Sequence, residues 1–138
     1  MTKEFWINLP VKDIAKSKEF FTKLGFSFST QYGNGTDMAG LMIGEKKIMV
    51  MLFAEATFKK FTKNELTDTK KSTEVLFSFD AENKEEVDEM AKKAATAGGT
   101  VFSKPADCEG WMYGCGFADL DGHRWNILYM DMSKMPKK

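Results

Sequence analysis

The residue types best suited to chemistry in this chain of 138 residues gather near its C-terminal end. His123 and Arg124 are the only histidine and the only arginine, and they directly follow the dipeptide Asp121-Gly122. Asp-Gly predicts a two-residue hairpin turn, because glycine readily adopts the positive φ that such a turn requires. The segment Gly116–Met130 therefore reads as the end of one strand, a turn and a final strand.

Each of these residues has a functional and a plainer interpretation. Arg124 suits bidentate pairing with an anionic ligand or with Glu74; the alternative is a surface residue after a turn. Glu74 is the candidate catalytic group, a base or a cation ligand on an apolar wall, unless it is solvated or paired with Arg124 near a strand end. For His123, a structural hydrogen bond to the turn or to Asp119 is favoured over catalysis. No nucleophile at a helix start accompanies it, and Cys115 is near only in sequence, so no triad is predicted.

Composition narrows the classes of partner. The chain has 20 basic and 20 acidic residues, whereas binding of nucleic acid or an anionic membrane needs a basic excess. No apolar run approaches the ~20 residues of a membrane span, and the N-terminus shows no signal-peptide core. Cys108 and Cys115 fit neither a disulfide framework nor a zinc pattern. We expect one cytoplasmic globular domain, with no nucleic-acid and no membrane partner.

Periodicity predicts the same order of elements twice. The first half predicts a strand at 5–11, a helix at about 14–24 capped by Asp13 and ended by Gly25, strands at 26–30, 38–43 and 47–53, and a turn at 31–35. The second half predicts a strand at 74–79, a helix capped by Asn83 and stopped by Gly98-Gly99, and strands at 100–103, 111–117 and 124–130. Each half reads β-α-β-β-β, and an internal duplication is the simplest account. Module one then covers about 1–54 and module two about 73–131, with a connector at 55–72 that holds a short helix near Phe58 and Phe61.

Each module would cover one sheet face with its helix and leave the other open. Two such modules side by side would form a half-barrel around a cleft, the default place for a ligand. Strand alternation assigns the more apolar set of residues to the helix side: Ile7, Leu9, Val11, Ile48, Val50, Leu52, Val75, Phe77, Trp125 and Ile127. It assigns these residues to the cleft: Trp6, Asn8, Met49, Met51, Phe53, Glu74, Leu76, Ser78, Arg124, Asn126 and Leu128. The aromatic and methionine side chains of the cleft, joined by Trp111 and Tyr113, predict a pocket for a flat apolar ligand, or else packing against each other or against a second subunit.

Two motifs resemble a known family. The segment Asn8–Phe26, N-L-P-V-K-D-I-A-K-S-K-E-F-F-T-K-L-G-F, resembles the opening of the vicinal oxygen chelate superfamily, which contains glyoxalases, bleomycin resistance proteins and extradiol dioxygenases. The segment Phe117–Ile127, F-A-D-L-D-G-H-R-W-N-I, resembles its final hairpin. The resemblance implies an α+β fold of two β-α-β-β-β modules and a homodimer.

The same resemblance tests for metal chemistry. Metal-using members place ligands on the first and last strands of each half, and these places fall on Trp6, near Met51, on Glu74 and on Asn126. An indole and a thioether do not suit a hard or borderline divalent ion. The two positions that remain offer only one carboxylate and one amide, which are too few ligands to hold such an ion well. We therefore expect no metal and no cofactor.

The function expected from these residues is metal-independent binding of a small organic molecule. The residues assigned to it are Trp6, Asn8, Met49, Met51, Phe53, Glu74, Tyr113, Arg124 and Asn126. The alternative is an enzyme of the same superfamily. It would be a metal-dependent lyase or dioxygenase-like enzyme that uses Glu74, Asn126 and ligands from a partner chain, or a metal-free isomerase that uses Glu74.

Overall fold

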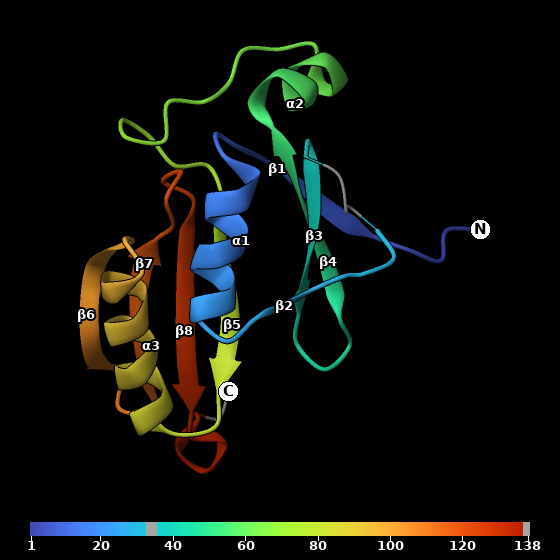
Figure 1. Cartoon of the computed structure of the whole chain (residues 1–138). Coiled ribbons are helices and arrows are strands. Elements are labelled where there is room, and N and C mark those ends of the chain that lie inside the picture. The colour runs from blue at the N-terminus through green and yellow to red at the C-terminus, as the bar shows by residue number, and fades with distance from the viewer. Residues whose placement is uncertain (33–35, 137–138) are drawn as a thin grey trace. The chain divides into compact units, whose positions relative to one another are not determined.

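The computed structural model describes residues 1–32 and 36–136, so the turn predicted at 31–35 lies partly outside the described residues. The chain forms two compact units, Met1–Ser72 and Thr73–Lys138. Each unit holds one mixed four-stranded sheet (Figure 1), and a helix of the same unit packs on that sheet. The predicted fold class, α+β with two β-α-β-β-β modules, is confirmed.

The first unit has the strand order β1-β4-β3-β2, in which β1 runs parallel to β4 and the other neighbours are antiparallel. Its elements are β1 (Trp6–Val11), α1 (Ile14–Lys23), β2 (Ser27–Phe28), β3 (Met38–Ile43), β4 (Ile48–Ala54) and α2 (Glu55–Thr62). Helix α1 begins as predicted, because the Asp13 carboxylate accepts a hydrogen bond from the Lys16 N–H at 3.0 Å. It ends before Gly25, whose φ of +100° favours glycine.

The core of the first unit lies between α1 and the sheet. Phe20 and Phe21 are each 1% exposed, and their rings meet edge to face at 5.1 Å. They pack against the sheet, where Leu52, predicted on the helix side, and Leu41 are fully buried. Ile48, also predicted on that side, is 50% exposed, since it opens β4 beside the turn. Alternation therefore assigned the faces of this sheet correctly apart from a strand end.

The second unit repeats this arrangement with the order β5-β8-β7-β6. Its elements are β5 (Leu76–Ala81), α3 (Lys84–Thr96), β6 (Thr100–Cys108), β7 (Met112–Ala118), β8 (Arg124–Met130) and a 3-10 turn at Met132–Lys134. Asn83 caps α3 as predicted, with its side-chain oxygen 2.8 Å from the Glu86 N–H. Helix α3 packs on the four strands (Figure 1) and buries Trp125 and Ile127 at 1% and 0% exposure.

The predicted boundaries of β5 and β6 need correction. Strand β5 begins at Leu76, two residues later than predicted. Strand β6 continues to Cys108 instead of ending at Ser103. It passes through Pro105 because β6 is an edge strand with shifts of register on both sides of Ser103, where a missing N–H is tolerated. The short helix predicted in the connector is confirmed as α2. No helix in the described part of the chain is long and apolar enough to cross a membrane.

The turn before β8 is wider than the predicted two-residue turn. Gly122 has the predicted positive φ, +82°, but its N–H bonds the Asp119 carbonyl, while the Asp119 N–H bonds the His123 carbonyl. These bonds enclose a three-residue loop. The loop is wider because the Asp119 carboxylate accepts the N–H groups of Asp121 and His123 at 2.9 and 3.0 Å.

Candidate functional site

We define the first outer face as the side of the first sheet turned away from α1. The register places on it Trp6, Asn8, Pro10, Met38, Gly40, Met42, Met49, Met51 and Phe53. Met49 lies between Trp6 on β1 and Met42 on β3, which gives a row of one indole and two thioethers. None of these side chains is ionisable, so the face offers polarisable, adaptable apolar contact.

Gly40 explains how the methionines fit on this face. A Cβ atom at Gly40 would lie 2.9 Å from the Met49 sulfur and 3.3 Å from the Tyr32 carbonyl oxygen. The thioether of Met49 therefore lies directly over β3. At one end of the face, the Phe61 ring of α2 meets the Phe53 ring edge to face at 5.2 Å. Five predicted ligand residues, Trp6, Asn8, Met49, Met51 and Phe53, thus share one face.

We define the second outer face as the side of the second sheet turned away from α3. The register places on it Leu76, Ser78, Asp80, Ser103, Ala106, Met112, Gly114, Gly116, Ala118, Arg124, Asn126, Leu128 and Met130. Arg124 and Asn126, both predicted ligand residues, lie two apart on β8. The Asn126 amide donates to the Ser78 hydroxyl at 3.4 Å. This face is more polar than the first and carries the chain's only guanidinium.

Tyr113 does not lie on an outer face, which corrects its predicted placement beside the other ligand residues. It pairs with Tyr129 on the helix side of the sheet, and its hydroxyl donates to the Asp88 carboxylate of α3 at 2.6 Å. That hydrogen bond, followed by partial burial, raises the pKa of Tyr113 to about 12. Trp111, the other aromatic residue predicted for the pocket, lies in the turn between β6 and β7. The β7 aromatic side chains therefore contribute to packing on α3.

Glu74 is exposed in a bend before β5 and does not belong to the sheet. The pairing of β5 with β8 begins at Leu76 and Arg124. Among the described residues, no ion pair joins Glu74 to Arg124. The predicted placement of Glu74 on a sheet face, with apolar neighbours, is therefore wrong.

The positions at which the resemblance implies metal ligands carry side chains that do not suit a divalent ion. Trp6, Met51 and Asn126 lie on outer faces, but they offer an indole, a thioether and an amide. Glu74 lies outside the strand. Residues 1–32 and 36–136 contain no group of three or more His, Cys, Asp or Glu side chains that could hold an ion.

Asp119 is a buried structural group at the last hairpin, 7% exposed. One carboxylate oxygen accepts the two backbone N–H groups of the turn, and the other accepts the Trp125 indole N–H at 3.0 Å. Burial raises the pKa of Asp119, while nearby His123 and the Trp125 hydrogen bond act in the opposite direction. The backbone N–H of His123 takes part in this network, while the structural role predicted for the His123 side chain stays a prediction.

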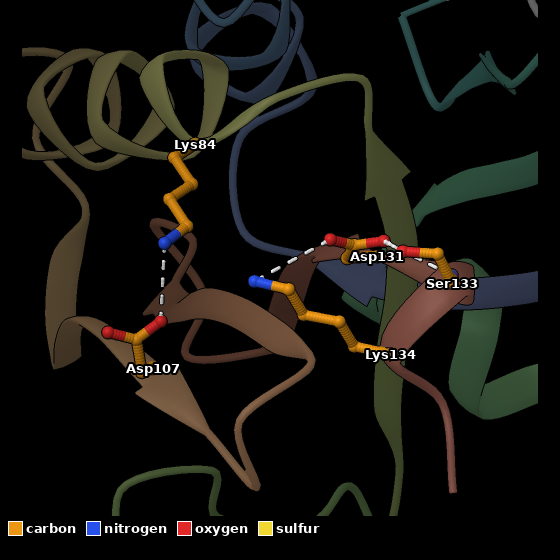
Figure 2. Close-up of polar contacts among 5 residues, drawn as sticks. All are labelled: Lys84, Asp107, Asp131, Ser133 and Lys134. Atoms are coloured by element: carbon orange, nitrogen blue, oxygen red, sulfur yellow. Dashed lines mark hydrogen bonds and ion pairs between the residues drawn. The ribbon is translucent and has the colours of Figure 1, made fainter.

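Other polar side chains of the second unit pair with groups of the same unit. Lys84 of α3 reaches Asp107 of β6 at 3.4 Å, while Asp131 binds Ser133 and Lys134 after β8 (Figure 2). These side chains are mostly exposed, so each ion pair contributes little to stability. The Cys115 thiol faces α3, 3.8 Å from the Val87 carbonyl, and burial raises its pKa to about 11. It is a poor nucleophile in this position.

Two sheets built from repeated β-α-β-β-β modules, each with one helix-covered face, define the class of protein. A family model described as the Glyoxalase/Bleomycin resistance protein/Dioxygenase superfamily matches residues 5–127. The chain therefore belongs to this superfamily.

Solved structures agree with this assignment. A hypothetical protein from S. aureus is 35% identical, with a TM-score of 0.83 and 94% of each chain covered. A family enzyme from Burkholderia phytofirmans is 20% identical, with a TM-score of 0.76, 91% of this chain and 96% of that one covered; this likeness shows the fold alone. No curated protein matches the chain.

Sequence reasoning missed Phe102 and the glycine beneath it. The Phe102 ring extends from β6 over Gly116, where a Cβ atom would lie 2.5 Å from the end of the ring. The Arg124 guanidinium carbon lies 4.2 Å from the centre of the same ring. The alternation of Gly114 and Gly116 along β7 was a usable signal, because glycines on one strand face indicate a close approach by other groups.

Proposed function

We propose that this chain binds a small organic molecule on its outer sheet faces without a metal ion. The observation that carries the proposal is the row of Trp6, Met49 and Met42 on the first outer face, where no ionisable group is present. Methionine adapts to irregular apolar surfaces, and an indole offers a large flat contact. Trp6 is 54% exposed, so part of this row is available to a ligand.

The metal-independent part of the proposal depends on donor chemistry. Trp6 and Met51 occupy two of the positions at which metal-using relatives place oxygen or nitrogen ligands, and neither side chain suits such an ion. The exposed position of Glu74 gives no support to the enzymatic alternative, because a catalytic base needs a fixed place beside its substrate.

The binding test uses the neutral fluorescent ligand N-phenyl-1-naphthylamine. We expect saturable binding to the wild type, and about tenfold weaker binding to Met49→Gln, because an amide replaces an apolar group that the ligand would cover. Met132→Gln is the matched control, since Met132 is 62% exposed in the 3-10 turn and lies outside both sheets. Absence of saturable binding, or equal weakening by both variants, would overturn the proposal.

Metal analysis tests the second half of the proposal. Protein purified without chelator should contain no stoichiometric zinc, nickel, iron or manganese, and EDTA should leave the dye affinity unchanged. A stoichiometric metal whose removal abolishes dye binding would show that the ligand site depends on an ion.

A further inference from the structure

Arg124 occupies an unusual place for a cation. It opens β8, a central strand, with Leu76 opposite on β5 and Ala118 opposite on β7. It lies on the second outer face, so its aliphatic chain lies against a sheet and not on a surface loop. The side chain is part-buried, and its Nε atom is fully buried.

Phe102 holds the guanidinium in position. The distance of 4.2 Å from the guanidinium carbon to the ring centre is that of a close cation–π contact. The ring can lie there only because Gly116 has no side chain beneath it. A cation–π contact uses none of the guanidinium's N–H groups as hydrogen-bond donors, so the terminal N–H groups can still bond a ligand.

No anion among the described residues neutralises this charge. Arg124 has no ion pair there, and its buried Nε has no hydrogen-bond partner. Asp80, an acid on the same face, pairs in register with Leu128, about 13 Å along β8 from Arg124. Taking a charge partly out of water is costly, and an anionic ligand would offset this cost.

We propose that Arg124 binds the acid group of an organic anion, a carboxylate or sulfonate attached to an apolar body. Its planar fork matches one such group with two parallel hydrogen bonds. Asn126 and Ser78 follow on the same face and add hydrogen-bonding groups beside it, while Leu76 and Leu128 supply apolar contact. This inference rests on the proposed function, because it names the chemical class of the ligand.

The single arginine makes the site directly observable. In a ¹H–¹⁵N spectrum, Arg124 gives the only arginine Nε–H signal of the chain. We expect 1-naphthoate to shift this signal saturably at neutral pH. The neutral analogue 1-naphthamide should leave it in place, since it has the same ring but no charge for the guanidinium to pair.

Affinity measurements with variants complete the test. Arg124→Met should weaken 1-naphthoate binding at least about tenfold and change 1-naphthamide binding less than about twofold, because only the charged hydrogen bonds are lost. The 1-naphthoate affinity of Arg124→Lys should fall between those of the wild type and Arg124→Met, because lysine keeps the charge but lacks the planar fork of donors. Lys18→Met is the control, because the Lys18 ammonium also lies over a ring, 5.8 Å from the centre of Phe28, but in the first unit.

Two outcomes separate this inference from the proposed function. If the neutral dye binds but 1-naphthoate leaves the Arg124 signal unmoved, or Arg124→Met weakens acid and amide equally, the anion site is wrong and the proposed function stands. If 1-naphthoate moves the signal but the dye does not bind, the apolar first face fails and the anion site remains.

Discussion

The first outer face carries Met38, Met42, Met49 and Met51 beside Trp6, whereas the second carries Ser78, Asn126 and Arg124. The helix-covered faces of the two sheets are much more alike, since both are filled by buried aliphatic and aromatic side chains. Packing against a helix restricts the residues on one face of each module, because a change of volume in a close-packed core is costly. The outer faces are free of this restriction and differ, one offering apolar contact and the other more polar contact.

The last hairpins of the modules differ in a similar way. In the first, the turn between β3 and β4 is exposed and relies on a hydrogen bond from the Lys47 N–H to the Gly44 carbonyl. In the second, the buried Asp119 carboxylate accepts three N–H groups. The same place in the repeat is therefore a simple surface turn in one unit and a buried polar network in the other.

Replacing Asp119 should have the largest effect. We expect Asp119→Ala to lower the free energy of unfolding by about 2–4 kcal/mol, because it leaves buried donors, including the Trp125 indole, without an acceptor. Glu45→Ala, in the exposed turn of the first unit, should cost less than about 0.5 kcal/mol. Urea unfolding followed by tryptophan fluorescence measures both. Similar losses in the two variants would remove the contrast between the hairpins.

Replacing the glycines of the second outer face should have the next largest effect on stability. A Cβ atom at Gly114 would lie 2.7 Å from the Ile127 carbonyl oxygen, part of the backbone of the central strand. Gly114→Ala should therefore destabilise the protein by about 1–3 kcal/mol. Gly116→Ala meets only the movable end of the Phe102 ring, so its cost should be below about 1 kcal/mol.

The two glycine variants also differ in their effect on binding. Gly116→Ala should displace the Phe102 ring from Arg124 and weaken 1-naphthoate binding although the protein stays folded. Thermal unfolding gives the order of stability, and the Arg124 Nε–H signal reports the position of the guanidinium. A larger loss of stability in Gly116→Ala than in Gly114→Ala would contradict this account of the second outer face.

The parts of the fold that sequence predicts well are those set by local chemistry. Asp13 and Asn83 are caps whose side chains act within three residues, and alternation in β1, β4 and β8 follows from strand geometry alone. The order of elements followed from these signals. The predicted homodimer depends on a second chain and stays a prediction.

The errors concern register between strands. Tyr113 was assigned to the ligand site, but its pairing with Tyr129 places it on the helix side. Phe102 was overlooked because the register shifts next to it in β6, where simple alternation fails. Glu74 was placed on a strand that begins two residues later. Pairing across strands depends on contacts distant in sequence, so a single sequence leaves it open.

Ionisation of Tyr113 should have the smallest effect on stability, and this effect should be specific to the second unit. Its neutral hydroxyl donates to Asp88, whereas the ionised form loses that bond and is repelled, so folding raises the pKa of Tyr113 from 10.0 to about 12. The folded state thus holds the proton more tightly than the unfolded state. The resulting stabilisation is complete below pH 10 and is lost as the pH rises through about 12.

We therefore expect the urea midpoint of the wild type to fall more between pH 9 and pH 12 than that of Tyr113→Phe, which has no hydroxyl to ionise. Tyr32→Phe, an exposed position in the first unit, should follow the wild type. The difference should be small, because the Tyr113–Asp88 pair is only partly shielded from water. If Tyr113→Phe and the wild type lose the same stability over this range, the hydrogen bond from Tyr113 to Asp88 of α3 does not stabilise the second unit.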